Sequence, residues 1–339
     1  MSQVIELGGD GVYLRSFLKP LEPWLARADI TEILVNQPGE IWIESNTAPQ
    51  MERIPVPDLT ATALSRLAAQ VARTNHQAVS RAHPLLSGSL PGGERIQIVA
   101  PPATRRHLAL AIRKHVPVDL DLSHYAASGA FDQVRRETGG DDAELRQLLD
   151  SGDTLGFFKA AVAARKTILV SGGTSSGKTT FLNALLKQIG PHERVVTIED
   201  TPEVSLDRPN ALGLVAVRGD TGEANVGTEE LLQAALRMRP DRLLLGEMRG
   251  AEAFSFLRAV NTGHPGSIST IHANSPRGAI EQVALLALQA RVNLGRAEIV
   301  DYARSVIDIV VQLRRDAGGN RVVDAIEMTG SAGVQPSGS

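Results

Sequence analysis

One stretch of the sequence decides the fold: Gly172-Gly173-Thr174-Ser175-Ser176-Gly177-Lys178-Thr179, followed by Thr180. It fits the pattern G-x-x-x-x-G-K-[ST] of a P-loop in full. The apolar run 168–170 leads directly into the glycines, and a helical pattern opens at Lys178, which gives the strand, loop and helix that a P-loop requires. A glycine and serine turn before a buried helix is the alternative. We therefore expect residues 172–180 to bind phosphate groups.

The chemistry of such a loop indicates ATP and Mg²⁺ as ligands. Its glycines let consecutive backbone N–H groups curl around an anion, and the dipole of the following helix adds to the attraction. Lys178 is expected to reach the β and γ phosphates, and Thr179 to bind Mg²⁺. A GTPase is disfavoured, because no Asn-Lys-x-Asp segment that would read guanine occurs in the chain.

Two further predicted strands end in acidic residues. The run 243–246 leads into Glu247, whose carboxylate could orient or deprotonate an attacking water. The run 195–198 leads into Glu199-Asp200-Thr201-Pro202-Glu203. Three acids at one strand end would repel one another unless a cation lay among them, so we expect Mg²⁺ or its water shell there, with a solvated acidic surface as the alternative. The candidate metal ligands are Thr179, Asp200, Glu203 and Glu247.

His264 and His272 flank a glycine-rich predicted strand. Two histidines eight positions apart, with no cysteine nearby, make a poor zinc site. Beside a nucleotide an imidazole can hydrogen-bond the γ-phosphate, but a histidine is more often an ordinary core residue. The spacing leaves both interpretations open.

Strand and helix patterns alternate around these motifs. Strands are expected at 167–171, 194–198, 243–246 and 267–272, and helices at 178–188, 228–238 and 251–260. This alternation predicts an α/β domain with a mostly parallel sheet and helices on both faces. An added hairpin, 307–314 with 321–328, is expected to close it.

A smaller α+β domain is predicted at the N-terminus. It would contain a hairpin of 33–35 with 41–43, an amphipathic helix around residues 64–71, and strands at 85–90, 94–100 and 107–114. The alternation of the last two strands places Arg95 and Arg113 on the face opposite their apolar residues, which we expect to be open. The predicted boundaries are 1–116 for this domain, 117–152 for a linker with one or two short helices, 153–330 for the P-loop domain and 331–339 for a disordered tail.

Length and composition bound the function. The 339 residues suffice for about two domains at roughly 150 residues each. The longest apolar run, Val283 to Leu288, is far shorter than the roughly 20 residues of a membrane-spanning helix, and the first ten residues lack a secretory signal pattern, so a cytoplasmic protein is expected. The absence of cysteine excludes disulfides and thiolate zinc sites. A net charge of −3 disfavours a protein that coats nucleic acid, so the basic pairs Arg105-Arg106 and Arg113-Lys114 are better interpreted as solvated surface.

Four segments resemble, in order and spacing, the Walker A, Asp box, Walker B and His box of the type II/type IV secretion ATPase superfamily: GGTSSGKTT, VVTIEDTPE, RPDRLLLGEMRGAEAF and NTGHPGSISTIHAN. Within it the chain looks most like the traffic ATPases of type IV secretion and conjugation systems. The lack of cysteine excludes the tetracysteine zinc module found in many type II secretion ATPases. Residues 93–97 and 111–113 resemble, more loosely, two segments that bring arginines to the nucleotide.

The resemblance implies a RecA-like motor that forms a homo-hexamer, binds ATP between its two domains and docks peripherally on the cytoplasmic face of the inner membrane, against a secretion channel and its other ATPases. It implies no sequence-specific contact with nucleic acid. Carried over by residue, the catalytic candidates are Glu247, Glu203, Arg95, Arg113 and His272, and His264 joins the P-loop residues in binding nucleotide. Gly246 stands where many P-loop enzymes have Asp, so the acid that binds Mg²⁺ stays open among Asp200, Glu203 and Glu247. The alternatives are a pilus assembly or retraction ATPase, a RecA-like nucleic-acid translocase, and a scaffold that binds nucleotide without hydrolysing it.

Overall fold

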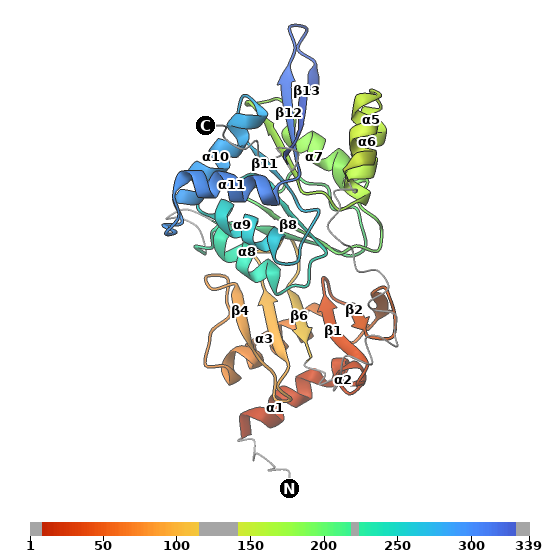
Figure 1. Ribbon diagram of the computed structural model, residues 1–339. Coiled ribbons are helices and arrows are strands. Elements are labelled where there is room, and N and C mark those ends of the chain that lie inside the picture. Colours follow the sequence, from red (N-terminus) through yellow and green to blue (C-terminus); the bar gives the residue numbers. More distant parts are fainter. Residues whose placement is uncertain (1–8, 115–141, 218–223, 330–339) are drawn as a thin grey trace, which may run out of the picture.

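The computed structural model describes residues 9–114, 142–217 and 224–329 (Figure 1). The first range, here the N-terminal domain, is built on a six-stranded sheet, and the other two, here the P-loop domain, on a seven-stranded sheet. Most of the predicted linker and the whole predicted tail lie outside the described residues. The chain resumes in helix α5 (Ala143–Asp150), which packs on α6 (Thr154–Ala163).

The N-terminal sheet is antiparallel and has the strand order β3-β2-β1-β6-β5-β4. Its strands are β1 (Ile30–Val35), β2 (Glu40–Ser45), β3 (Glu52–Pro55), β4 (Leu85–Ser89), β5 (Arg95–Val99) and β6 (Ala109–Arg113). The helical elements are α1 (Gly9–Leu18), η1 (Lys19–Leu21), α2 (Glu22–Leu25) and α3 (Ala61–Thr74). The predicted hairpin is thus β1 with β2, and the predicted amphipathic helix is α3, which begins where the Thr60 hydroxyl accepts a hydrogen bond from the Ala63 amide at 3.1 Å.

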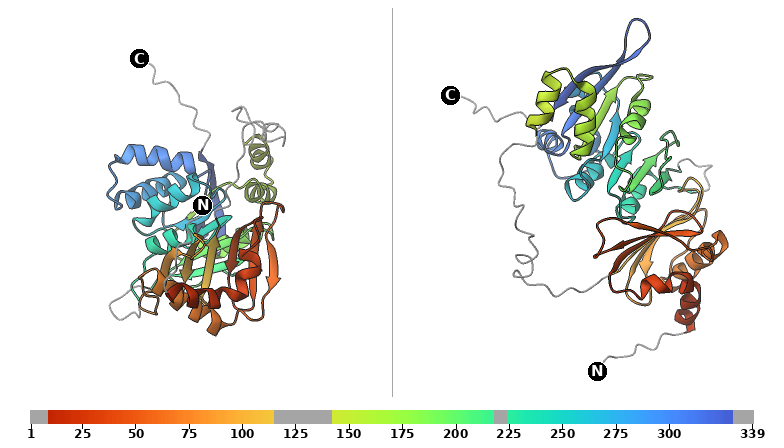
Figure 2. Two further views of the ribbon diagram at one scale, coloured as in Figure 1. Left: turned by 90° about the horizontal axis from the view of Figure 1, so that it is seen from below. Right: turned by 90° about the vertical axis from the view of Figure 1, so that its right-hand side faces the viewer.

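The two faces of this sheet pack against different partners. Ile33, Ile98 and Ile112 belong to a core with the buried residues of α1 and α3. Leu34 and Ala111, which point the other way, join a hydrophobic cluster with the P-loop domain. The P-loop domain thus covers the part of this face around Leu34 and Ala111 (Figure 2), while Arg95 and Arg113, at the ends of their strands, stay exposed as expected.

The P-loop sheet has the order β13-β12-β7-β11-β10-β8-β9, and all its pairings are parallel except that of β13. Its strands are β7 (Ile168–Gly172), β8 (Val195–Glu199), β9 (Ala211–Val215), β10 (Arg242–Leu245), β11 (Ile268–Ile271), β12 (Ile309–Arg315) and β13 (Arg321–Met328). The predicted parallel sheet is confirmed. The predicted hairpin differs in one respect: β12 pairs along β7 and is a full member of the central sheet, so only β13 is added to it.

Helices cover both faces of this sheet, as predicted (Figure 1). One face carries α5, α6 and α7 (Lys178–Leu186) over a core that includes Phe157, Leu182 and Val170. The other carries α8 (Thr228–Leu236), α9 (Glu252–Asn261), α10 (Pro276–Leu288) and α11 (Arg296–Val306). The sequence patterns did not predict β9, α10 or α11. In the ranges described above, no helix is both long and apolar enough to cross a bilayer.

Candidate functional site

A cavity of about 450 Å³ opens where β7, β8, β10 and β11 end. Ligands of open α/β sheets bind at such carboxyl ends of strands. The cavity collects predicted site residues from four separate segments of the chain. They are Thr174, Ser175, Ser176, Gly177, Lys178, Thr179, Thr180, Asp200, Glu203, Glu247 and His272. Gly172 and Gly173 precede these residues at the end of β7.

The P-loop takes the conformation that its glycines permit. Gly177 has φ +92°, and a Cβ placed there would lie 2.6 Å from Cδ of Arg321. A Cβ on Gly172 would lie 2.4 Å from Oγ of the buried Ser176 and 2.8 Å from the carbonyl oxygen of Leu313. Side chains are therefore excluded at both ends of the loop, which leaves a cradle of main-chain groups before α7.

Lys178 begins α7 and lies across the loop. Its Nζ donates to the carbonyl oxygens of Gly172 and Gly173, both at 3.1 Å, and lies 3.4 Å from Nδ1 of His272. Burial lowers the pKa of Lys178, and the carboxylate of Glu247 partly opposes that change. The three N–H donors of the ammonium group thus face weak, neutral acceptors, which phosphate oxygens could replace.

Glu247 follows β10 and meets two basic side chains. Its carboxylate forms an ion pair with Arg249, and its Oε1 lies 2.7 Å from Nε2 of His272. His272 therefore lies between the Lys178 ammonium, which its Nδ1 faces, and the Glu247 carboxylate, which its Nε2 faces.

Two of the three acids at the end of β8 pair with arginines of the chain itself. Asp200 pairs with Arg249 at 3.1 Å, and Glu199 pairs with Arg105. Two guanidinium groups thus supply opposite charge to these acids, so their closeness does not by itself require a metal ion, and the expected Mg²⁺ stays a prediction. In the described parts of the chain, no three His, Asp or Glu side chains gather as a metal-binding cluster.

The cavity nevertheless offers donors that suit Mg²⁺. The hydroxyl of Thr179 and the carboxylates of Asp200, Glu203 and Glu247 all line it, beside the phosphate cradle. Mg²⁺ in nucleotide sites usually takes one or two carboxylates and completes its shell with water and phosphate oxygens. The residues present fit that mode of binding better than a site built from protein side chains alone.

Arg95, Arg113 and His264 lie elsewhere. They line a second cavity, of about 720 Å³, together with Glu32 and Arg165. Arg165 precedes β7 and His264 precedes β11, so this cavity lies at the amino ends of the parallel strands. The P-loop lies at the opposite edge of the sheet, where the strands have their carboxyl ends. Strands of four or five residues separate the two ends by about 15 Å. In this arrangement, the two arginines of one chain do not reach its own nucleotide cavity.

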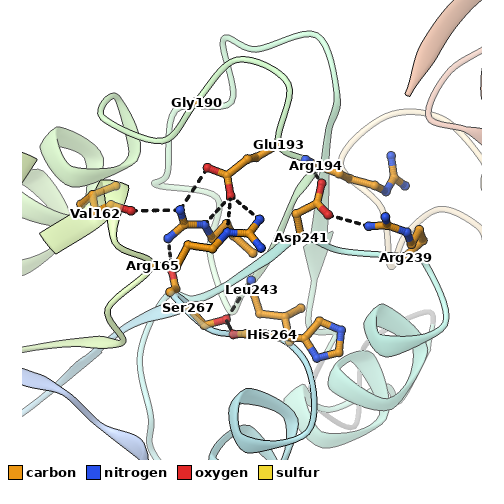
Figure 3. A network of polar contacts seen from close by, with 12 residues as sticks. Val162, Arg165, Gly190, Glu193, Arg194, Arg239, Asp241, Leu243, His264 and Ser267 are labelled. Carbon is orange, nitrogen blue, oxygen red and sulfur yellow. Dashed lines mark hydrogen bonds and ion pairs between the residues drawn. The ribbon is translucent and has the colours of Figure 1, made fainter. Parts of the chain in front are cut away.

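A polar network at these amino ends explains what His264 does (Figure 3). Its Nδ1 lies 3.0 Å from the carbonyl oxygen of Ala259 in α9, and its own carbonyl oxygen accepts from the hydroxyl of Ser267 at 2.7 Å. Close by, the carboxylate of Glu193 holds Arg165 and the buried Arg242 at 2.6 and 2.7 Å. For His264 these contacts support the alternative that the sequence left open, that of a structural residue.

Glu32 also faces the second cavity. It is buried in β1, and burial raises its pKa to about 7, although Arg113 at 3.5 Å acts in the opposite direction. Nearby, Arg239 of the P-loop domain forms ion pairs with Glu44 of β2 and with Asp241. The walls of this cavity thus come from both domains, and charged groups hold them together.

The sequence did not point to two arginines that line the nucleotide cavity. Arg249 lies two positions after Glu247 inside a quoted motif, and Arg321 comes from the start of β13. The proximity of Arg249 to a candidate acid was a usable signal. Nothing in the local sequence places Arg321 beside Gly177, because that contact depends on the pairing of β12 with β7.

Comparison with known proteins agrees with the geometry. Residues 16–317 match the family described as type II/IV secretion system protein. The VirB11 protein of a type IV secretion system from Bartonella henselae is 37% identical over 324 residues, which cover 91% of this chain and 90% of that protein. A PtlH homolog from a type IV secretion system of Bordetella bronchiseptica is 43% identical over 322 residues, covering 91% and 93%.

A solved structure is similar over almost the whole chain. It is the VirB11 ATPase of the Brucella suis type IV secretion system in complex with sulphate, with a TM-score of 0.87 and 36% identity. The match covers 94% of this chain and 95% of that one.

Proposed function

The chain belongs to the type II/IV secretion system protein family, and from that premise we propose that it is an Mg²⁺-dependent ATPase that powers a type IV secretion or conjugation machine. The observation that carries this proposal is the convergence of Lys178, Thr179, Glu247 and His272 on one cavity at the carboxyl ends of the strands. Relatives that are named as type IV secretion proteins favour this machine over a pilus motor or a nucleic-acid translocase.

We propose the following division of work for the hydrolysis of ATP to ADP and phosphate. The P-loop amides and Lys178 bind the phosphates, with Lys178 exchanging two carbonyl partners for phosphate oxygens. Thr179, with a carboxylate from Asp200, Glu203 or Glu247, would hold Mg²⁺, which neutralises charge on the phosphate oxygens when bound. Glu247 orients the attacking water and can accept its proton, and His272 positions that carboxylate.

The proposed setting follows the family. Copies of the chain form a hexameric ring that docks peripherally on the cytoplasmic side of an inner-membrane secretion channel and meets the other ATPases of that machine. Within the ring, Arg95 and Arg113 would stabilise charge on the transferred phosphoryl group. Since one chain keeps them away from its own P-loop cavity, we propose that they act on the nucleotide of a neighbouring copy.

Phosphate release by the purified protein tests the proposed activity. We expect ATP turnover in the presence of Mg²⁺, and we expect Lys178→Ala to lower it by about 100-fold or more. Lys187→Ala is the matched control, because Lys187 is exposed just after α7 and should leave turnover unchanged. Turnover that survives Lys178→Ala would refute the proposal.

A further inference from the structure

A short segment of the N-terminal domain attaches to the edge of the P-loop sheet. The carbonyl oxygen of Ala103 accepts from the amide of Val215 at 2.9 Å, and the amide of Arg105 donates to the carbonyl oxygen of Gly213 at 3.2 Å. Between them Thr104 forms an antiparallel bridge with Leu214. The segment 103–105 therefore lies along β9. A displacement of the N-terminal domain would move this segment and strain its hydrogen bonds to β9.

The side chain of Arg105 passes over β9 into the P-loop domain. A Cβ on Gly213 would lie 2.5 Å from Nε of Arg105, so the glycine makes room for the guanidinium group. That group forms an ion pair with Glu199 and donates from Nη1 to the carbonyl oxygen of Val204 at 2.9 Å. The side chain of Glu199 is only 3% exposed, so this ion pair is largely removed from water.

Glu199 in turn holds the turn that carries the candidate acids. Its Oε1 accepts hydrogen bonds from the amides of Glu203 and Val204, at 2.9 and 2.8 Å. Asp200 and Glu203 both lie in this turn and line the nucleotide cavity. Arg105 thus contacts the turn in two ways: it donates a hydrogen bond to Val204, and it pairs with the carboxylate of Glu199, which accepts from two amides of the turn.

We propose that Arg105 is a positioning residue that makes the placement of Asp200 and Glu203 depend on how the N-terminal domain is docked. Without Arg105, the Glu199 carboxylate is buried with no ion-pair partner and the carbonyl oxygen of Val204 loses a donor, so the turn is held less firmly. This inference rests on the proposed ATPase function for its catalytic consequence, but the geometry can be tested without catalysis.

Amide hydrogen exchange in the full-length protein provides that test. In Arg105→Ala, a peptide covering 200–206 should exchange about tenfold faster or more, because Glu199, without its ion pair, holds the amides of Glu203 and Val204 less firmly. A peptide covering β7 should not change. Arg106→Ala is the matched control: Arg106 is the next residue, is exposed and carries the same charge. Unchanged protection of 200–206 in Arg105→Ala would overturn the proposal.

Kinetics separate positioning from general damage. Arg105→Ala should lower kcat by about tenfold while the affinity for ATP stays within about twofold, because the P-loop is untouched. Arg105→Ala should lower kcat less in a chain that already carries Glu199→Gln than in the wild-type chain, because Arg105 acts through Glu199. Equal losses in kcat and in ATP affinity would contradict a positioning role.

Arg105→Lys keeps the test usable if the alanine variant folds poorly. Lysine can pair with Glu199 but lacks the fork that also reaches Val204, so kcat and protection should fall between wild type and Arg105→Ala. Protection equal to that of the alanine variant would overturn the assigned role of the ion pair. Lys178→Ala should abolish turnover without altering exchange at 200–206, so failure of the ATPase function and failure of this inference give different results.

Discussion

Individual residues of the nucleotide cavity differ in how far the sequence predicts them. Lys178, Thr179 and Glu247 follow strands within recognisable motifs, so a local pattern suffices to find them. The arginines that neutralise the acids come from positions that are remote in the sequence: Arg249 lies 49 positions from Asp200, and Arg105 lies 94 from Glu199. Such pairs depend on which strands become neighbours, and a single sequence does not contain that information.

Glu32 makes the stability of the chain depend on pH. Its pKa rises from an ordinary 4.5 to about 7 in the folded chain, so between these values the folded state binds a proton that the unfolded state releases. Burial of Glu32 therefore leaves the free energy of unfolding unchanged at low pH and lowers it by on the order of 3 kcal/mol once the pH exceeds 7. We expect Glu32→Gln to be more stable than wild type at pH 8 and equally stable at pH 4.5, as measured by urea unfolding.

The control for Glu32→Gln is Glu52→Gln on the exposed strand β3, which should change stability little at either pH. A gain for Glu32→Gln of the same size at both pH values would show that the buried charge is not its cause.

Elements were predicted best where periodicity and turn residues agree. The strands and helices around the P-loop appear within a few residues of their predicted bounds, because apolar runs, glycines and helix starts coincide there. Helix α10 was missed, although its N-terminus carries both Ser275, which caps it by accepting from the amide of Gly278, and Pro276 in the first turn. Strand β9 was also missed; it contains Gly213, which makes room for the side chain of Arg105.

The junction between β7 and α7 gives a prediction at this scale. Gly177→Ala forces a side chain into a left-handed backbone conformation and against Arg321, so we expect it to lower the free energy of unfolding by about 1–2 kcal/mol. Gly173→Ala should change that free energy by less than about 0.5 kcal/mol, since a Cβ there meets no atom within 4 Å. Chemical denaturation of both variants measures these free energies. Equal values for the two variants would show that the positive φ of Gly177 and its contact with Arg321 do not exclude a side chain there.

At the scale of the whole molecule, the N-terminal domain occupies the face and edge of the P-loop domain rather than its nucleotide cavity. The contacts run from Asn36 with Asn210, at 3.2 Å near the start of β9, to Arg105 with Glu199 at the end of β8. The sequence predicted two domains and the strands that carry Arg95 and Arg113. It did not predict their docking, which depends on complementary surfaces that no local pattern encodes.

This docking leads to a prediction for mixed assemblies. If Arg113 acts on a neighbour's nucleotide, an Arg113→Ala chain still offers an intact P-loop, and a Lys178→Ala chain still offers an intact arginine. Mixing the two inactive variants should therefore restore phosphate release well above the sum of the separate samples. Lys178→Ala mixed with Glu247→Gln serves as the control and should show no such gain, since both changes disable the same cavity. No recovery in the first mixture would contradict action between copies.

The central claim is that ATP is cleaved in the cavity at the carboxyl ends of the strands, with Glu247 acting on the water. Single-turnover cleavage of ATP by wild type and Glu247→Gln, measured beside ATP affinity, tests it most directly. The account predicts affinities within about threefold of each other and cleavage slower by about 100-fold or more in the variant. Cleavage at the wild-type rate by Glu247→Gln would contradict it.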